Sequence, residues 1–119
     1  MNRADLGRRG EARAARHVRR HGLRIIARNW RCPDGELDIL ARDGDLLVVI
    51  EVRTARTDFA GGPIATVGPD KRRRLAHLAQ RWLSGSRWAP AGVRFDVVGV
   101  VYRGWFRWRL DWVRGAFEV

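Results

Sequence analysis

Two apolar-rich segments joined at Gly44-Asp45 constrain the fold of this chain more than any other feature. A Gly-Asp pair between such segments is typical of a β-hairpin with a two-residue type II′ turn. That turn fixes which residues of the two predicted strands face each other. The expected partners are Arg42 with Leu47, Asp38 with Glu51, and Glu36 with Arg53.

Asp38 and Glu51 would be like charges placed directly opposite each other. The second segment, Leu46–Ile50, is apolar on both faces, as in a central strand, so the acids lie at the end of a buried element. At roughly 5 Å and an effective dielectric of about 20, their repulsion is about 3 kcal/mol, more than intrinsic strand preference can offset. The pair therefore needs protonation, a basic neighbour or a bound cation.

The charge of the chain favours a polyanionic partner. Its 119 residues include 24 Lys and Arg against 13 Asp and Glu, which gives a net charge of +11. A field of that sign attracts phosphate backbones. No basic amphipathic helix with bulky apolar residues favours a membrane surface instead. We therefore expect nucleic acid, and no membrane, as the partner.

The length of the chain and its lack of targeting signals indicate a single cytoplasmic domain spanning residues 1–119. No apolar run approaches the ~20 residues of a membrane-spanning helix, and the N-terminus lacks the apolar core of a signal peptide. Cys32 is the only cysteine, which excludes an internal disulfide and a Cys-rich zinc site.

A first helix is expected from Asp5, its cap, to about His21, and Glu11 lies on its apolar stripe. Ala14, Ala15 and Val18 follow Glu11 by three, four and seven residues. An acid on a packed stripe needs a partner. Glu11 is either half of a salt bridge to an arginine or a third carboxylate that points at the hairpin, and the residues alone leave both open.

The remaining pattern predicts an α/β fold in αβββαβ order. The expected elements are a first strand from Leu23 that ends in Arg28–Arg31, the hairpin, a helix from Pro69 to Leu83, and a strand from Val93 to Tyr102. The glycine-rich segment Ala55–Pro69 is a plain connection or a mobile flap over a site. The tail Gly104–Trp112 alternates aromatic and basic residues, as in an edge strand or a strip that stacks on bases and contacts phosphates.

Four basic residues, Lys71–Arg74, begin the second helix. Cations there oppose the helix macrodipole by roughly 0.3–1 kcal/mol each. A phosphate bound at this end would relieve the cost, whereas a solvated run of charges needs no ligand. Near the later strand, Arg94 and Asp96 are expected to form a structural ion pair.

Carboxylates gathered on a central hairpin are typical of a divalent-cation site. Mg²⁺ prefers carboxylate and water oxygens, often with only one or two protein carboxylates. It activates water and neutralises charge at a phosphate. Together with the basic surface, this predicts phosphodiester hydrolysis with Mg²⁺ or Mn²⁺.

The order Asp38…Glu51-Val52-Arg53 resembles the PD-(D/E)xK nuclease core. The whole chain resembles the YraN-type family of uncharacterised bacterial proteins, which is related to Holliday-junction resolvases. The motifs that carry this resemblance are Gly10-Glu11-Ala12, Arg28-Asn29-Trp30-Arg31, Gly35-Glu36-Leu37-Asp38, Glu51-Val52-Arg53-Thr54, Lys71, Arg94-Phe95-Asp96-Val97-Val98 and Trp112…Ala116-Phe117.

The resemblance implies a restriction-endonuclease-like core with a central mixed sheet of four or five strands flanked by helices. It implies Asp38 and Glu51 as metal ligands and Glu11 as an accessory acid. Arg53 stands where the nuclease lysine is usual, and arginine stays protonated, so it can stabilise an oxyanion but cannot act as a base. Lys71 is the one lysine that could replace it from the second helix.

These observations support a metal-dependent, structure-selective nuclease of branched or flapped DNA, which could work as a homodimer. The expected nucleic-acid contacts are Arg28, Arg31, Lys71, Arg72, Arg73 and Arg74. Two alternatives remain: a catalytically inactive nuclease-fold module that binds DNA or RNA, with Glu36 and Arg53 paired across the strands, and a protein-interaction subunit.

Overall fold

The computed structural model describes all residues, 1–119, as one α/β unit. Its elements are α1 (Arg3–Arg20), β1 (Arg24–Cys32), β2 (Gly35–Asp43), β3 (Leu46–Ala55), the 3₁₀ helix η1 (Pro63–Thr66), α2 (Pro69–Ser84), β4 (Gly92–Tyr102) and β5 (Trp108–Phe117). The predicted αβββαβ order is confirmed, and the tail adds β5 as an edge strand.

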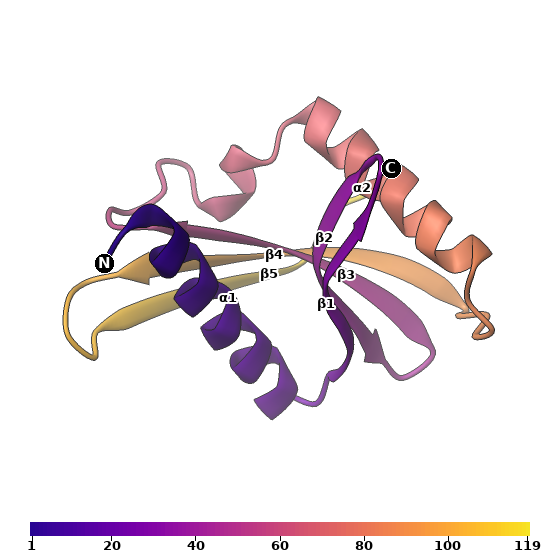
Figure 1. Ribbon diagram of the computed structural model, residues 1–119, viewed down its shortest axis with the longest axis horizontal. Helices are drawn as coiled ribbons and strands as arrows, with labels where there is room; N and C mark the ends of the chain where they lie inside the picture. The colour runs from indigo at the N-terminus through magenta and orange to yellow at the C-terminus, as the bar shows by residue number, and fades with distance from the viewer.

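The five strands form one mixed sheet in the order β1-β2-β3-β4-β5. Only β3 and β4 run parallel, and the other neighbours are antiparallel. Parallel neighbours need a crossover connection, which η1 and α2 supply. This is the predicted restriction-endonuclease-like core, with the helices lying at separate sides of the twisted sheet (Figure 1).

Each helix covers its own hydrophobic core. Beneath α1, Ala14, Ala15 and Val18 pack on alternate residues of β3 and β4. On the other face, Leu75 and Leu78 of α2 pack on the complementary set. The alternation of side chains along β3 thus assigns Leu47, Val49 and then Glu51 to the face of α2.

The first helix begins earlier than predicted. Asn2, rather than Asp5, is the N-cap, because its side chain accepts a hydrogen bond from the backbone N–H of Asp5 at 2.8 Å. Gly10 brings α1 close to β3, since a Cβ at this position would collide with the side chain of Thr54. This approach places Glu11, the next residue, near the C-terminal end of the central strand β3.

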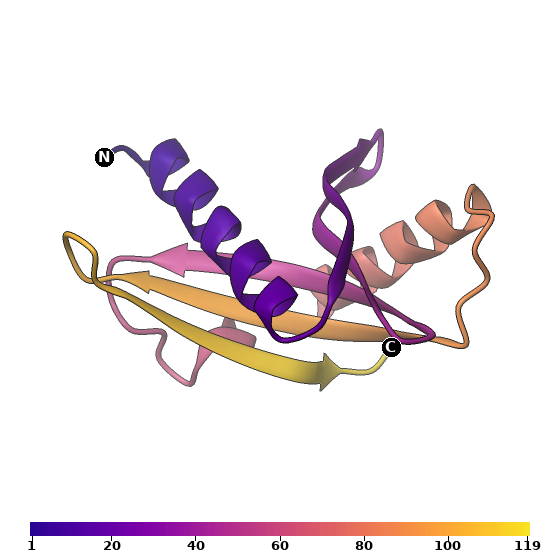
Figure 2. The same cartoon turned by 90° about the horizontal axis from the view of Figure 1, so that it is seen from below.

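The turn between β2 and β3 is as predicted, but the pairing of the two strands ends before it reaches Asp38 and Glu51. Gly44 has φ +60°, as type II′ requires, and the ladder runs from Asp43–Leu46 to Ile39–Ile50. Beyond that point the turn end of the β1–β2 hairpin bends away from β3 (Figure 2). The predicted ladder pairs Asp38–Glu51 and Glu36–Arg53 are therefore wrong.

Glu36 instead faces Arg31 of β1, with 3.3 Å between Oε2 and Nε. The interpretation in which Glu36 and Arg53 form a cross-strand pair fails for the same reason: β2 has left the ladder before it reaches them. Arg53 is thus free of the hairpin and turns to other partners.

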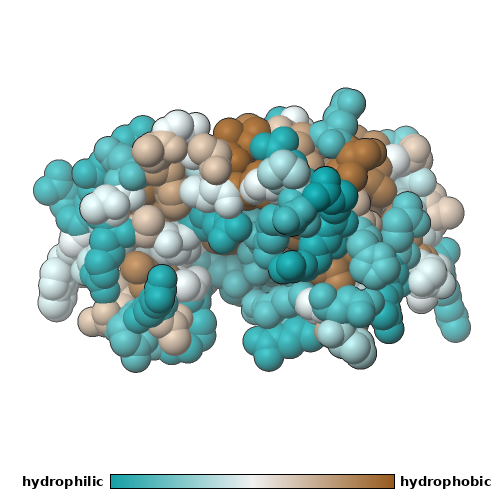
Figure 3. All heavy atoms as spheres, turned by 90° about the horizontal axis from the view of Figure 1, so that it is seen from above, coloured by the Kyte–Doolittle hydropathy of each residue, from teal (hydrophilic) through white to brown (hydrophobic).

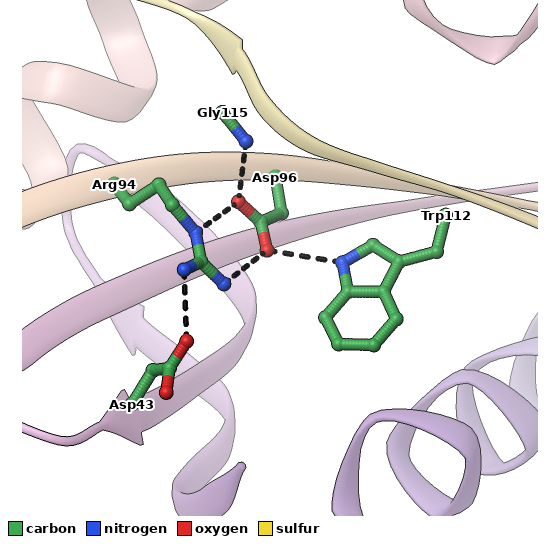
Figure 4. Close-up of polar contacts among 5 residues, drawn as sticks. All are labelled: Asp43, Arg94, Asp96, Trp112 and Gly115. Carbon is green, nitrogen blue, oxygen red and sulfur yellow. Dashed lines mark hydrogen bonds and ion pairs between the residues drawn. The ribbon is translucent and has the colours of Figure 1, made fainter. Parts of the chain in front are cut away.

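The predicted Arg94–Asp96 ion pair is confirmed and is part of a larger network (Figure 4). Arg94 donates to both Asp96 oxygens, at 2.9 and 3.0 Å, and to Asp43 at 2.8 Å. The buried Asp96 carboxylate also accepts from the indole N–H of Trp112 and from the backbone N–H of Gly115, each at 3.0 Å. Gly115, at φ +58°, lies in a bulge of β5 opposite Asp96.

The segment between β3 and α2 is packed against the sheet. Phe59 and Pro63 lie over Gly99 of β4, where a Cβ would collide with Pro63. Pro63 and Val67 are buried. The segment therefore borders the end of β3, where the predicted site residues lie. None of the helices has the length and apolarity needed to cross a membrane.

Candidate active site

Glu51 is a buried carboxylate with two cations beside it. It is 4% exposed on β3, and its Oε2 lies 3.1 Å from Nζ of Lys71 and 3.6 Å from a terminal nitrogen of Arg53. Lys71 reaches it from the first turn of α2, which Pro69 begins. Burying a charge is costly unless it is paired, so these cations make an ionised Glu51 tolerable.

Arg53 is held in place on its other side. It donates to the backbone carbonyl of Thr66 at 3.2 Å, while its buried Nε has no hydrogen-bond partner. Lys71 has no contact other than Glu51 among the hydrogen bonds and ion pairs, and its side chain is 31% exposed. Lys71 is therefore held by fewer contacts than Arg53.

Asp38 lies beside Glu51 without a cation of its own. Its Oδ2 accepts a hydrogen bond from the backbone N–H of Val52 at 2.9 Å. This bond replaces the backbone hydrogen bond that is lost where the β2–β3 ladder ends. Burial, followed by the hydrogen bond to Glu51 and its negative charge, raises the pKa of Asp38 to about 8. The compensation that the sequence required is thus twofold: a proton on Asp38 and basic neighbours at Glu51.

Glu11 faces the same region from α1. Its nearest cation is Arg28, at 3.7 Å from Oε1, and that buried oxygen has no hydrogen-bond partner. Burial raises the pKa of Glu11, an effect that Arg28 partly opposes. No three His, Cys, Asp or Glu side chains come together as metal ligands, so Glu11 does not join Asp38 and Glu51 at one point.

The predicted nucleic-acid contacts separate into two groups. Arg73 and Arg74 are exposed on α2, and Arg31 is exposed at the end of β1. Arg72 instead folds back, donating to the carbonyl of Val67 at 2.8 Å, with its guanidinium over the Phe117 ring. Arg72 therefore stabilises the start of α2.

The surface above α2 and the segment that precedes it is largely hydrophilic (Figure 3). The larger hollows of the molecule lie elsewhere, and none is lined by Asp38 or Glu51. Glu51 is only 4% exposed, so the carboxylates lie beneath the surface rather than in one of these hollows.

Two backbone groups of the site have no signal in the sequence. The N–H of Val52 is free for Asp38 only because the β2–β3 ladder ends, and the Thr66 carbonyl reaches Arg53 only because η1 packs on β4. Lys71, which the sequence offers as a possible substitute for the usual lysine, lies 3.1 Å from Glu51.

Comparison with known proteins gives the chain a family. Residues 10–100 match Uncharacterised protein family UPF0102. A UPF0102 protein of Ectopseudomonas mendocina is 44% identical over 115 residues, which cover 96% of this chain and 95% of the relative. Another, of a Parafrankia species, is 50% identical over 113 residues, covering 94% and 95%.

A UPF0102 protein of Streptomyces coelicolor is 50% identical over 101 residues, which cover 83% of this chain and 78% of the relative. The matched region contains Glu11, Asp38, Glu51 and Lys71. Since the family match spans most of the chain and these relatives align over most of their length, the chain belongs to the UPF0102 family, as the YraN-type resemblance indicated.

Proposed function

We propose that the protein is a metal-dependent endonuclease that hydrolyses phosphodiester bonds in branched or flapped DNA. The observation that carries the proposal is the juxtaposition of Asp38 and Glu51 with Lys71, whose Nζ lies 3.1 Å from Glu51. Two carboxylates and a lysine, which come from β2, β3 and α2, have no need to meet if they serve packing alone.

The donor set suits Mg²⁺ or Mn²⁺. Asp38 and Glu51 offer oxygen ligands from adjacent strands, and two protein carboxylates are a common set for Mg²⁺. The orphaned Oε1 of Glu11 is an acceptor that a metal-bound water can satisfy. When bound, the cation supplies charge neutralisation at the phosphate and an activated water.

Lys71 and Arg53 have different roles in this proposal. Lys71 neutralises Glu51, and it would be available to contact a phosphate oxygen if Asp38 and Glu51 held a cation. Its ammonium is a compact charge on a flexible stem, which suits a contact that changes during the reaction. Arg53, fixed between Glu51 and Thr66, keeps a permanent charge beside the phosphate and orients it.

The basic surface supplies the binding energy. A net charge of +11 attracts the nucleic-acid backbone, and Arg31, Arg73 and Arg74 are exposed, although Arg31 pairs with Glu36 and Arg73 with Asp70. Arg28 also contributes, although it shares its charge with Glu11. Phosphate contacts of this kind position a duplex without reading its sequence, so we expect selection by DNA shape.

The test is cleavage of fluorescent four-way junction and flap DNA with Mg²⁺ or Mn²⁺. We expect wild type to cleave, and the near-isosteric variants Asp38→Asn, Glu51→Gln and Lys71→Met to lose at least about 100-fold in rate, as when one transition-state contact is removed. Arg87→Ala, which removes an exposed arginine lining a hollow away from the carboxylates, is the matched control. Equal cleavage by wild type and Glu51→Gln would exclude this site.

A second candidate is a nuclease-fold module that binds nucleic acid without cleaving it. Its support is the electrostatic balance already present: Glu51 is neutralised by Lys71 and Arg53, and Asp38 retains a proton. Tight, salt-sensitive DNA binding by wild type, without metal-dependent cleavage of any substrate, would favour this module over the enzyme.

A further inference from the structure

The turn between β4 and β5, residues 103–107, exposes two aromatic rings that the proposed site does not use. Trp105 is 83% and Phe106 is 89% exposed, the highest values among the large hydrophobic residues. They lie in the turn rather than in the predicted edge strand, since β5 begins only at Trp108. We call these five residues the β4–β5 tip.

The β4–β5 tip is a defined turn. Arg103 N–H donates to the Arg107 carbonyl at 2.7 Å, and Arg107 N–H donates to the Gly104 carbonyl at 3.0 Å. Phe106 has φ +59°, a left-handed conformation that is unfavourable for an aromatic residue. The turn thus holds both rings away from the protein interior, where they would otherwise be buried.

The turn between β4 and β5 lies near the start of α1 (Figure 2). A hollow beside the rings is lined by residues of both elements. Its volume is about 390 Å³, within the range of ligand sites. Four aromatic residues, two arginines and Met1 line it; the aromatic residues are Tyr102, Trp105, Phe106 and Trp108, and the arginines are Arg9 and Arg13. Flat apolar walls and positive charges therefore share one concave surface.

The charge of this surface is not neutralised. Arg9, Arg13 and Arg107 make no salt bridge, whereas Arg103 and Arg109 share the single carboxylate Asp58. Arg13 already lies over the Trp108 ring, at 4.5 Å from its centroid. Rings for stacking beside unpaired guanidinium groups are complementary to a nucleotide, with its flat base and anionic phosphate.

We propose that the β4–β5 tip and this hollow bind unpaired bases of the nucleic acid by stacking, and so select DNA with single-stranded segments. Bases inside a duplex have no free faces, so only flaps, junction branch points and single strands offer this contact. The arginines that line the concave surface beside the rings favour an anionic ligand held in a hollow over a flat lipid surface.

The position of the tip suits a substrate that also reaches the carboxylates; this step rests on the proposed function. Val97 of β4 pairs with Glu51, and Tyr102 follows it by five residues. At ~3.3 Å per residue this is about 16 Å along β4. Because Glu51 faces α2 and the hollow lies beside α1, a substrate that meets both would pass around the end of the sheet.

The experiment measures binding by the full chain, without added metal, to three fluorescent probes: a 20-nucleotide oligo(dT), a blunt duplex and a flap. We expect the double variant Trp105→Ala/Phe106→Ala to bind oligo(dT) and the flap about 10- to 100-fold more weakly, and the duplex within about twofold of wild type. Trp105→Phe/Phe106→Tyr keeps two rings and should bind all three probes like wild type. Ile26→Ala, on the opposite edge strand, controls for loss of an exposed apolar side chain.

The outcomes separate the tip from the active site. Salt-sensitive DNA binding by wild type that the double variant retains on oligo(dT) would overturn the stacking role and leave the proposed function standing. Equal loss on all three probes would also overturn it. Failure of wild type to bind any probe would overturn both, and tip-dependent binding to anionic phospholipid vesicles in its place would assign the tip to a membrane.

Discussion

Asp38→Asn should remove a pH dependence that the carboxylate pair imposes on stability. Asparagine keeps the shape of the side chain and its acceptor for the Val52 N–H, but it has no proton to lose. In wild type, burial and the neighbouring Glu51 raise the Asp38 pKa from 3.8 to about 8. The folded protein therefore retains a proton on Asp38 that the unfolded chain releases.

The sign and the size follow from linkage. Between the unfolded pKa and the folded pKa, the native state binds one more proton, so the free energy of unfolding falls by about 1.4 kcal/mol per pH unit as pH rises. This stability is complete below the unfolded pKa and is lost as pH rises toward the folded pKa near 8. Between pH 5 and pH 7 wild type should lose about 2–3 kcal/mol relative to Asp38→Asn.

Urea unfolding at pH 5, 6 and 7, at constant ionic strength with EDTA present, measures this difference. Asp45→Asn, at an exposed acid in the hairpin turn, is the matched control and should follow wild type. If the unfolding free energies of wild type and Asp38→Asn change in parallel with pH, then Asp38 carries no extra proton and the description of the pair is incorrect.

Three further changes test how the site is supported. Gly99→Ala should destabilise the protein by about 1–3 kcal/mol in thermal unfolding, because its Cβ collides with Pro63; wild-type stability would contradict the packing of this segment. Asp96→Ala should cost about 3 kcal/mol in urea, because Arg94 is left partly buried with only Asp43; a cost below about 1 kcal/mol would contradict the network. Asn2→Ala should cost about 1 kcal/mol in helix stability, and no change in helicity by circular dichroism would show that the cap is dispensable.

The sequence predicts most of the fold because its signals are local. The Gly44-Asp45 turn sets the β2–β3 register near the turn, and Pro69 marks the start of α2. β2 separates from β3 on the N-terminal side of Ile39. No local sequence signal predicts this separation, because it depends on how the β1–β2 hairpin packs toward α2. There Asp34 pairs with His77 and Arg81.

The candidate site was predictable in its residues but not in its contacts. Opposed acids at Asp38 and Glu51 required compensation, and the structure supplies it by a proton and by Lys71. Which cation approaches Glu51 depends on where α2 packs. The alternation of side chains along β3 does not predict that position. The sequence does not predict that the Phe106 ring is exposed, because the aromatic-basic alternation of the tail continues through the turn. Gly104 is the one residue that signals a turn there.

The most direct test of the carboxylate site is calorimetric titration of the metal-free protein with Mn²⁺ at pH 7.5, in two buffers of different ionisation enthalpy. Wild type should bind Mn²⁺ and release a proton, because the cation displaces the proton held at Asp38. Glu51→Gln should lose binding, whereas Lys71→Met should bind at least as tightly, since Lys71 no longer competes for Glu51. Undiminished Mn²⁺ binding by Glu51→Gln, or none by wild type, would contradict the central claim that Asp38 and Glu51 form a metal site.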